Sequence, residues 1–341
     1  MSMYEICAFV ANDDGPAVLA TLIAAEGHSY RKPGAAMLFY PSGTLGSLSP
    51  GCLESDLSLQ AEAVWETART ASVEYDMRTP DDVGWGEAVG CGGRITVVLE
   101  PVIGELRDLL RQAKRRMDAG QSLVLRRIRQ ARGYTYAYRL EEGEWLQQKT
   151  EGELFATPLV PMPRLVLFGA GSDSGAIAEL AARAGFRIAV ADWREARLQG
   201  GFSAQESVLC PPGEAPRQLD ISNRDYVLIC SHSFLRDRDF LEQVLPRQPR
   251  YLGIVGSKTR IARLTEALEW PEGLSLHAPA GLAIGGEGPE EIAVSIVAEL
   301  IREKRAVIRS PWHEGGFYDE GLRDLSGSGE RQSNGRLQNL A

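Results

Sequence analysis

The sequence is poor in the residues that build metal and disulfide sites. It has 341 residues but only four histidines and five cysteines, and no two cysteines are spaced as C-x-x-C. A structural zinc site therefore has poor support. An odd number of cysteines in a long chain whose first residues carry no export signal fits a reducing compartment, so we expect a cytoplasmic protein.

Long apolar runs and an excess of positive charge are missing as well. No stretch approaches the roughly 18 consecutive apolar residues of a membrane span. The formal net charge is −9, whereas a nonspecific nucleic-acid binder needs a basic face for the phosphate backbone. We therefore expect neither a membrane nor a nucleic acid as a partner.

The strongest pattern that is present lies between residues 164 and 194. Leu165–Phe168 and Phe186–Ala191 are apolar runs too short for helices, so both suit buried strands. Between them, apolar residues recur at helical spacing up to a glycine stop. The turn before this helix has the spacing G-x-G-x-x-x-G, and its glycines are Gly169, Gly171 and Gly175. The pattern predicts the start of a doubly wound, Rossmann-like parallel sheet.

This glycine turn has the chemistry of a phosphate site. Gly169 permits a tight turn, Gly171 lets a phosphate approach the backbone, and the helix N-terminus offers free N–H groups. Asp192 lies 21 residues after Gly171, where an acidic residue can accept a hydrogen bond from a ribose hydroxyl. Two readings remain open: the turn binds a nucleotide or similar phosphate ligand, or its glycines serve turn geometry alone.

The length of the chain predicts two domains. We expect an N-terminal α+β domain over residues 1–155 that ends in an antiparallel meander. A proline-rich linker is expected over 156–163, followed by the Rossmann-like α/β domain over 164–310. Residues 311–341 are polar and are predicted to form a mobile tail.

Two groups of candidate binding residues follow from this layout. In an open α/β sheet, ligands bind outside the carboxyl ends of the strands, and polar residues there are expected to share the crevice of the glycine turn. These residues are His232, Gly256, Ser257, Lys258 and His277. In the first domain, two cysteines stand in glycine-rich turns beside regular elements, where a ligand can reach them. The residues of these turns are Gly51, Cys52, Glu54, Cys91, Gly92 and Gly93.

Seven segments, in order along both domains, match a known family. They are GHSYRKPGAAML (27–38), GSLSPGCLESD (46–56), CGGRITVVLEP (91–101), LVLFGAGSDSG (165–175), SHSFLRDRDFLEQVL (231–245), YLGIVGSKTR (251–260) and HAPAGLAIGGEGPEEIAVSIVAEL (277–300). In these segments the chain resembles the XdhC/CoxI family, the accessory proteins of molybdenum hydroxylases such as xanthine dehydrogenase.

The resemblance implies a chaperone for molybdenum cofactor, the molybdopterin complex of molybdenum, in purine catabolism. Such a protein holds the cofactor for sulfuration by a cysteine desulfurase and passes it to the apo-hydroxylase. Molybdopterin-processing enzymes are further expected partners, and we expect a homodimer. Thiolates are soft metal ligands, so Cys52 and Cys91 are candidate ligands on the molybdenum side. Arg31 is a candidate to pair with the cofactor phosphate, as are Lys32 and Arg94.

The chain also departs from the family pattern. Many members have a histidine where this chain has Ser172, an aspartate where it has Ser233, and an acid where it has Ala283. We therefore assign no catalytic residue. The alternative function is an NAD(P)-dependent oxidoreductase that uses the glycine turn and Asp192, and a third is an inert scaffold.

Overall fold

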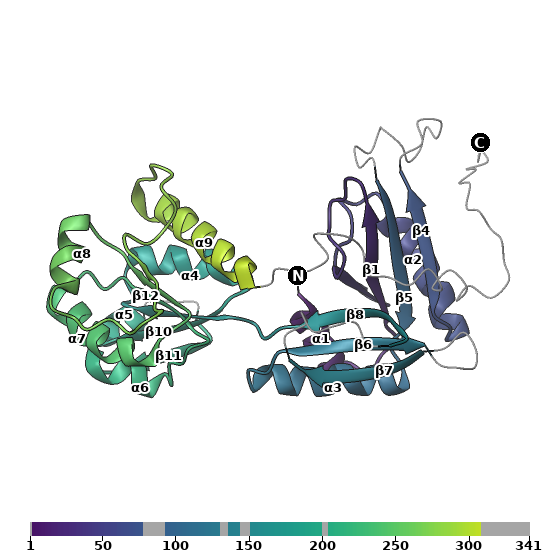
Figure 1. Cartoon of the computed structure of the whole chain (residues 1–341), viewed down its shortest axis with the longest axis horizontal. Helices are drawn as coiled ribbons and strands as arrows, with labels where there is room; N and C mark the ends of the chain where they lie inside the picture. Colours follow the sequence, from purple (N-terminus) through teal and green to yellow (C-terminus); the bar gives the residue numbers. More distant parts are fainter. Residues whose placement is uncertain (1, 78–92, 130–135, 144–150, 200–203, 308–341) are drawn as a thin grey trace. The chain divides into compact units, whose positions relative to one another are not determined.

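The computed structural model describes residues 2–77, 93–129, 136–143, 151–199 and 204–307. The chain divides into two compact units: the first includes residues up to Pro161, and the second begins at Met162. Figure 1 shows a layered arrangement of helices and strands in each unit. Among the described residues, none of the helices has the length and apolarity needed to cross a membrane.

The first unit is built on a five-stranded antiparallel sheet in the order β3-β2-β1-β5-β4. Its strands are β1 (Val18–Glu26), β2 (Ala36–Tyr40), β3 (Gly43–Gly46), β4 (Ala71–Asp76) and β5 (Arg94–Pro101). Helix α2 (Glu54–Thr67) packs on one face, and α1 (Met3–Asn12) with α3 (Gly104–Asp118) packs on the other. Both faces of β1 are therefore buried, which explains its apolar run, broken only by Thr21 before Glu26 ends the strand.

A second, three-stranded antiparallel sheet completes this unit, in the order β7-β6-β8. Its strands are β6 (Leu123–Arg129), β7 (Tyr136–Glu142) and β8 (Glu153–Leu159). The meander strand expected at 145–148 lies outside the described residues. Strand β8 instead comes from the proline-rich stretch and includes residues 156–159 of the expected linker. Pro158 is tolerated there because β8 is an edge strand, which among the described strands pairs with β6 alone.

The second unit is a six-stranded parallel sheet in the order β11-β10-β9-β12-β13-β14. Its strands are β9 (Arg164–Phe168), β10 (Arg187–Asp192), β11 (Glu206–Leu209), β12 (Tyr226–Ile229), β13 (Tyr251–Ile254) and β14 (Leu276–His277). Numbered within the unit, this order is 3-2-1-4-5-6, the order of the Rossmann fold. The predicted fold class is confirmed.

Helices cover both faces of this parallel sheet. One face is covered by α4 (Ser172–Arg183) and α9 (Gly288–Val307). The other face is covered by α6 (Ala215–Gln218), α7 (Phe234–Val244) and α8 (Lys258–Thr265), while the short α5 (Glu195–Leu198) follows β10. The strand order reverses between β9 and β12, so a ligand crevice is expected beyond the carboxyl ends of these two strands.

Candidate functional site

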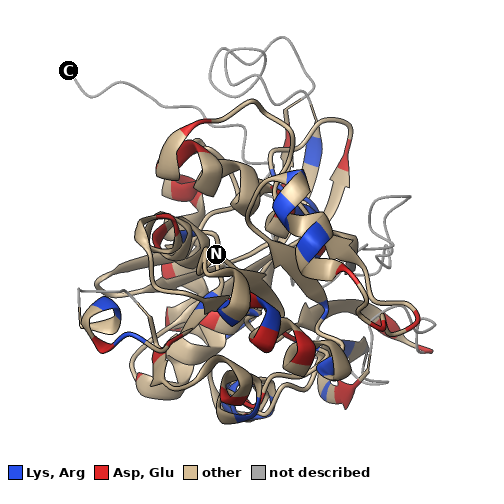
Figure 2. Cartoon of the chain, turned by 90° about the vertical axis from the view of Figure 1, so that its left-hand side faces the viewer, with Lys and Arg blue, Asp and Glu red and all other residues tan. Residues whose placement is uncertain are grey.

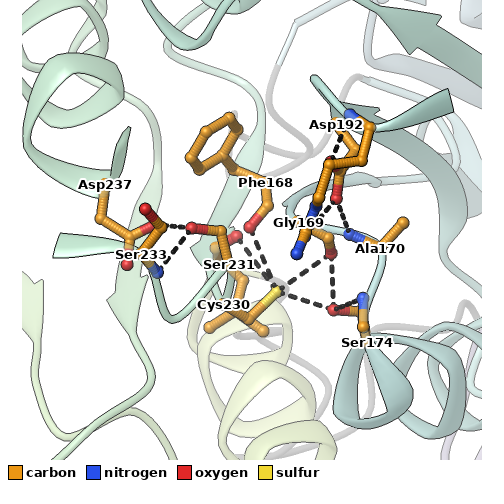
Figure 3. Close-up of polar contacts among 12 residues, drawn as sticks. Phe168, Gly169, Ala170, Ser174, Asp192, Cys230, Ser231, Ser233 and Asp237 are labelled. Atoms are coloured by element: carbon orange, nitrogen blue, oxygen red, sulfur yellow. Dashed lines mark hydrogen bonds and ion pairs between the residues drawn. The ribbon is translucent and has the colours of Figure 1, made fainter. Parts of the chain in front are cut away.

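The glycine turn after β9 brings two strand ends into close contact. Gly169 has φ +104°, a conformation that favours glycine. A Cβ atom at Gly169 would lie 2.5 Å from the Cα of Ser231, in the loop that follows β12. Only glycine therefore allows the loops after β9 and β12 to meet, and this contact forms the centre of the candidate site (Figure 3).

Gly171 leaves open space at the start of α4. A Cβ atom built there would meet no atom within 4 Å, and the same holds for Gly175. Gly171 precedes the first turn of α4, whose free N–H groups favour an anion. The geometry therefore provides the room for a close phosphate approach that the sequence predicts at Gly171.

His232 lies beside this turn, as its place after β12 predicts. The Nε2 atom of His232 is 3.1 Å from Oδ2 of Asp173, in the first turn of α4. The His232 ring is half exposed, and its φ of +61° turns the loop after β12 toward α4. The carboxylate of Asp173 thus sets a negative charge, with a histidine partner, at the N-terminus of the helix.

The buried side chains of Ser174 and Cys230 contact the glycine turn and fix its conformation. The Ser174 hydroxyl donates a hydrogen bond to the Gly169 carbonyl at 2.6 Å and lies 3.1 Å from the Cys230 sulfur. Burial raises the pKa of the Cys230 thiol to about 12. Cys230 therefore remains a thiol at neutral pH and holds the turn in place (Figure 3).

Asp192 at the end of β10 is fully buried and already holds four hydrogen bonds. Its carboxylate accepts from the backbone N–H groups of Ala170 (2.7 Å) and Arg194 (2.8 Å). It also accepts from Nε (2.9 Å) and Nη2 (2.7 Å) of the Arg194 side chain. A ribose hydroxyl, the partner that the sequence predicts for Asp192, would therefore have to displace Arg194.

The buried charge of Asp192 makes the stability of the fold depend on pH. Burial would raise the pKa of Asp192, but hydrogen bonds from Arg194 and Ala170 outweigh it and hold this pKa below its usual range. A lowered pKa stabilises the fold above the pKa of the unfolded state, about 4, and this contribution is lost as pH falls through the folded value.

We expect Asp192→Asn to unfold more easily than the wild type at pH 7, and this difference to shrink as the pH falls from 5 toward 3. Urea unfolding across this range measures the effect. Glu179→Gln, which removes an exposed carboxylate of α4, should keep the pH dependence of the wild type. If the difference in unfolding free energy between Asp192→Asn and the wild type stayed constant with pH, this prediction would be wrong.

Sequence reasoning missed a second buried acid beside these strand ends, Asp237 of α7. The Ser231 hydroxyl and Nη2 of Arg260 both donate to its carboxylate. Burial raises the pKa of Asp237 despite the opposing effect of these two partners. The available signal was an acid at helical spacing from the apolar residues Phe240, Leu241 and Val244, where a buried position is expected.

The turn Gly256-Ser257-Lys258 is linked to Asp237 by Arg260, which donates to the carboxylate of Asp237. The Ser257 hydroxyl caps α8 by accepting the Arg260 N–H at 3.3 Å, while Lys258 is exposed. A Cβ at Gly256 would lie 3.3 Å from Nη1 of Arg260. Among the described residues this Nη1 is one of two buried side-chain polar atoms that lack a hydrogen-bond partner.

His277 is held by different elements. Its Nδ1 is 3.4 Å from Oε1 of Glu299 in α9, and its ring stacks on Tyr251 of β13 at 4.4 Å. Glu299 also accepts from the Tyr251 hydroxyl at 2.8 Å. The contacts of His277 are thus to β13 and α9, whereas those of His232 are to α4.

In the first unit, Glu54 organises the loop that carries Cys52. Its carboxylate accepts from the Ser49 hydroxyl and from the backbone N–H groups of Leu48, Ser49 and Leu53. Burial acts to raise the pKa of Glu54, but these hydrogen bonds leave it lowered. Gly51 has φ +125° in this loop, and Cys52 is half-buried against the core beneath α2. Glu54 therefore positions the cysteine.

The second predicted cysteine turn is described only from Gly93 onward, because Cys91 and Gly92 lie outside the described residues. A Cβ at Gly93 would lie 2.2 Å from the carbonyl oxygen of His28, so the chain runs directly against the loop that carries Arg31. Arg94 faces three carboxylates on the sheet at 3.3–3.8 Å, those of Glu26, Glu74 and Asp76. Arg31 is half-buried. Among the described residues, no cluster of three or more His, Cys, Asp or Glu side chains is suited to hold a metal ion.

Comparisons with known proteins agree over both units. Residues 165–300 match the model of the XdhC Rossmann domain, and residues 10–76 match that of the XdhC and CoxI family. The chain is 33% identical over 318 residues to a Bacillus subtilis protein whose name describes it as part of a probable xanthine dehydrogenase, covering 86% of this chain and 95% of that protein.

Two further matches also cover most of both chains. The Escherichia coli molybdenum cofactor insertion chaperone PaoD is 27% identical over 297 residues, covering 83% of this chain and 82% of PaoD. A crystal structure described as a xanthine dehydrogenase from Bacillus halodurans superposes with a TM-score of 0.80 at 36% identity, covering 92% of this chain and 99% of that one.

Proposed function

Because the chain belongs to the XdhC and CoxI family, we propose that it is an accessory protein of a xanthine dehydrogenase-type molybdenum hydroxylase. In this role it binds molybdenum cofactor, presents it to a cysteine desulfurase for sulfuration and delivers it to the apo-enzyme in the cytoplasm. The observation that carries the proposal is similarity over more than four fifths of each chain to two proteins, one named as part of a xanthine dehydrogenase and the other as a cofactor insertion chaperone.

The buried acids of the second unit favour a role in ligand binding over a role in catalysis. A general acid or base must be free to exchange a proton with the reacting group. Here the carboxylates of Asp192 and Asp237 are buried and occupied by Arg194, Ser231 and Arg260. This arrangement supports a binding role and argues against an NAD-dependent oxidoreductase, in which Asp192 must accept hydrogen bonds from the ribose hydroxyls.

The described residues fit the chemistry of the cofactor in part. Within the second unit, the open space at Gly171 and the first N–H groups of α4 suit a phosphate group. Within the first unit, Cys52 suits the soft-ligand preference of a molybdenum centre, because it is half-buried in a loop that Glu54 holds in place. Cys91 remains the second candidate ligand. We propose a homodimer as the state that meets the client enzyme.

The test is to purify the full chain with molybdenum cofactor supplied and to measure bound molybdenum and pterin. We expect near-stoichiometric amounts of both for the wild type. Cys52→Ala and Cys91→Ala, with melting curves like that of the wild type, are each expected to lose most of the molybdenum. Cys210→Ala is the matched control because this thiol is buried at the end of β11 and should not matter.

Two outcomes would contradict the proposal. Retention of full molybdenum and pterin by both cysteine variants would remove the proposed ligands from the site. Wild-type protein that binds NAD(H) but no pterin, with this binding abolished in Asp192→Ala, would replace the accessory role by the oxidoreductase alternative.

A further inference from the structure

Two arginines from different elements meet at one indole ring at the carboxyl edge of the parallel sheet. Trp193 and Arg194 directly follow β10, whereas Arg236 lies in the first turn of α7. The guanidinium carbons of Arg194 and Arg236 are 4.3 Å and 5.7 Å from the centroid of the Trp193 ring. We refer to these three residues as the Trp193 cluster.

The position of the cluster is set by packing on the α7 face of the sheet. The Trp193 ring is half-buried and lies 5.9 Å from the ring of Phe168, in the core beneath α7. This contact packs the end of β10 against the end of β9. Because Arg236 lies at the start of α7, which follows β12, the cluster joins elements on both sides of the strand-order reversal, at the carboxyl edge that also carries Gly169 and Asp192.

The two arginines of the cluster differ in their ion pairing. Arg194 is paired with the buried Asp192 while 35% of its side chain is exposed. Arg236 is exposed, and no carboxylate pairs with it in the part of the chain that the structure describes. Figure 2 shows basic and acidic residues interspersed over the unit, so an anion would be drawn here by this local arrangement and not by a broad basic face.

The chemistry at this place selects for phosphate over a ribose diol. After the second strand of a doubly wound sheet, an acid receives ribose hydroxyls, whereas an arginine accommodates a phosphate on the ribose. The acceptor positions of Asp192 are filled by Ala170 and Arg194, so a ribose hydroxyl finds no free acceptor there. Guanidinium groups bind phosphate through paired N–H donors.

We propose that the Trp193 cluster is a binding site for the phosphomonoester of a small ring-containing ligand. Two ligands carry this chemistry: a nicotinamide dinucleotide with a 2′-phosphate, and a pterin with a terminal phosphate. The site goes beyond the proposed accessory role because it assigns phosphate recognition to residues of β10 and α7, apart from the two cysteine turns.

The test compares ligand pairs that differ by one phosphate, using calorimetry on the full chain. The pairs are NADP⁺ with NAD⁺, and a pterin phosphate with the same pterin after phosphatase treatment. The wild type is expected to prefer the phosphorylated member of at least one pair by about tenfold or more, the effect of one or two charged hydrogen bonds. A preference in the first pair alone identifies a nucleotide, and one in the second alone identifies the cofactor.

Arg236→Ala should remove most of this preference and leave the affinity for the unphosphorylated member unchanged. Arg236→Lys, which keeps the charge but loses the paired donors, should retain part of it. The matched control is Arg187→Ala, which removes another exposed positive charge at the opposite end of β10 and should keep the full preference. Equal or absent binding of both members of each pair, or an equal loss in Arg187→Ala, would overturn the proposal.

Discussion

Gly169→Ala is expected to destabilise the second unit by about 3–5 kcal/mol, a large part of the stability of a typical domain. The added Cβ would lie 2.5 Å from Cα and 2.7 Å from the backbone nitrogen of Ser231. Backbone atoms cannot rotate away as a side chain can, and alanine is strained at a φ of +104°. Urea unfolding followed by tryptophan fluorescence measures the loss.

Gly171→Ala, two residues further on, is the matched control. Gly171 has φ −89°, and its added Cβ would meet no atom within 4 Å, so the free energy of unfolding should change by less than about 0.5 kcal/mol. The methyl group would nevertheless occupy the space proposed for the ligand, and binding of a phosphate-bearing ligand should weaken. Equal stability of the two variants would show that the strand ends do not meet as described.

Glu100→Ala is expected to destabilise the first unit by about 3–5 kcal/mol, because it leaves a buried guanidinium without its carboxylate. Glu100 of β5 and Arg127 of β6 are both fully buried, and they pair through two hydrogen bonds of 2.7 Å and 3.1 Å. The Tyr138 hydroxyl donates to the same carboxylate at 3.1 Å. The pair links the five-stranded sheet to the three-stranded sheet, so thermal and urea unfolding should both report its loss.

An exposed pair in the same unit provides the control. Arg116 and Glu142 are 2.9 Å apart with the glutamate 59% exposed, so Glu142→Ala should cost less than about 1 kcal/mol. The double variant Glu100→Leu, Arg127→Met should recover much of the stability, because it removes both buried charges. A cost for Glu100→Ala no larger than that for Glu142→Ala would refute this account.

The Rossmann-like unit was open to prediction because its signals are local. The apolar runs at 165–168 and 186–191 differ from β9 and β10 by one residue at their ends. Gly169 of the turn is required by the approach of two strand ends, and a rule of topology places His232 beside it. Periodicity and glycine spacing act within about thirty residues, and the topology of the doubly wound sheet supplies the longer-range order of its strands.

The stretch at 152–163 shows the limit of local reasoning. Its prolines favoured a linker, yet Glu153–Leu159 forms β8. The strand exists because β6 offers it a partner, with Leu123 opposite Leu159, and because its side chains are buried there. Such pairing depends on residues more than twenty positions away, which no local pattern records.

The sequence by itself determined the fold of the second unit, the family of the chain and the turns that carry its candidate residues. Only the tertiary structure decided the state of these residues: Asp192 is saturated by Arg194, His277 is tied to Glu299, and Arg236 meets Trp193. The physical reason is that periodicity and glycine spacing fix local conformation along the chain, whereas hydrogen-bond partners and exposure are set by packing between elements distant in sequence.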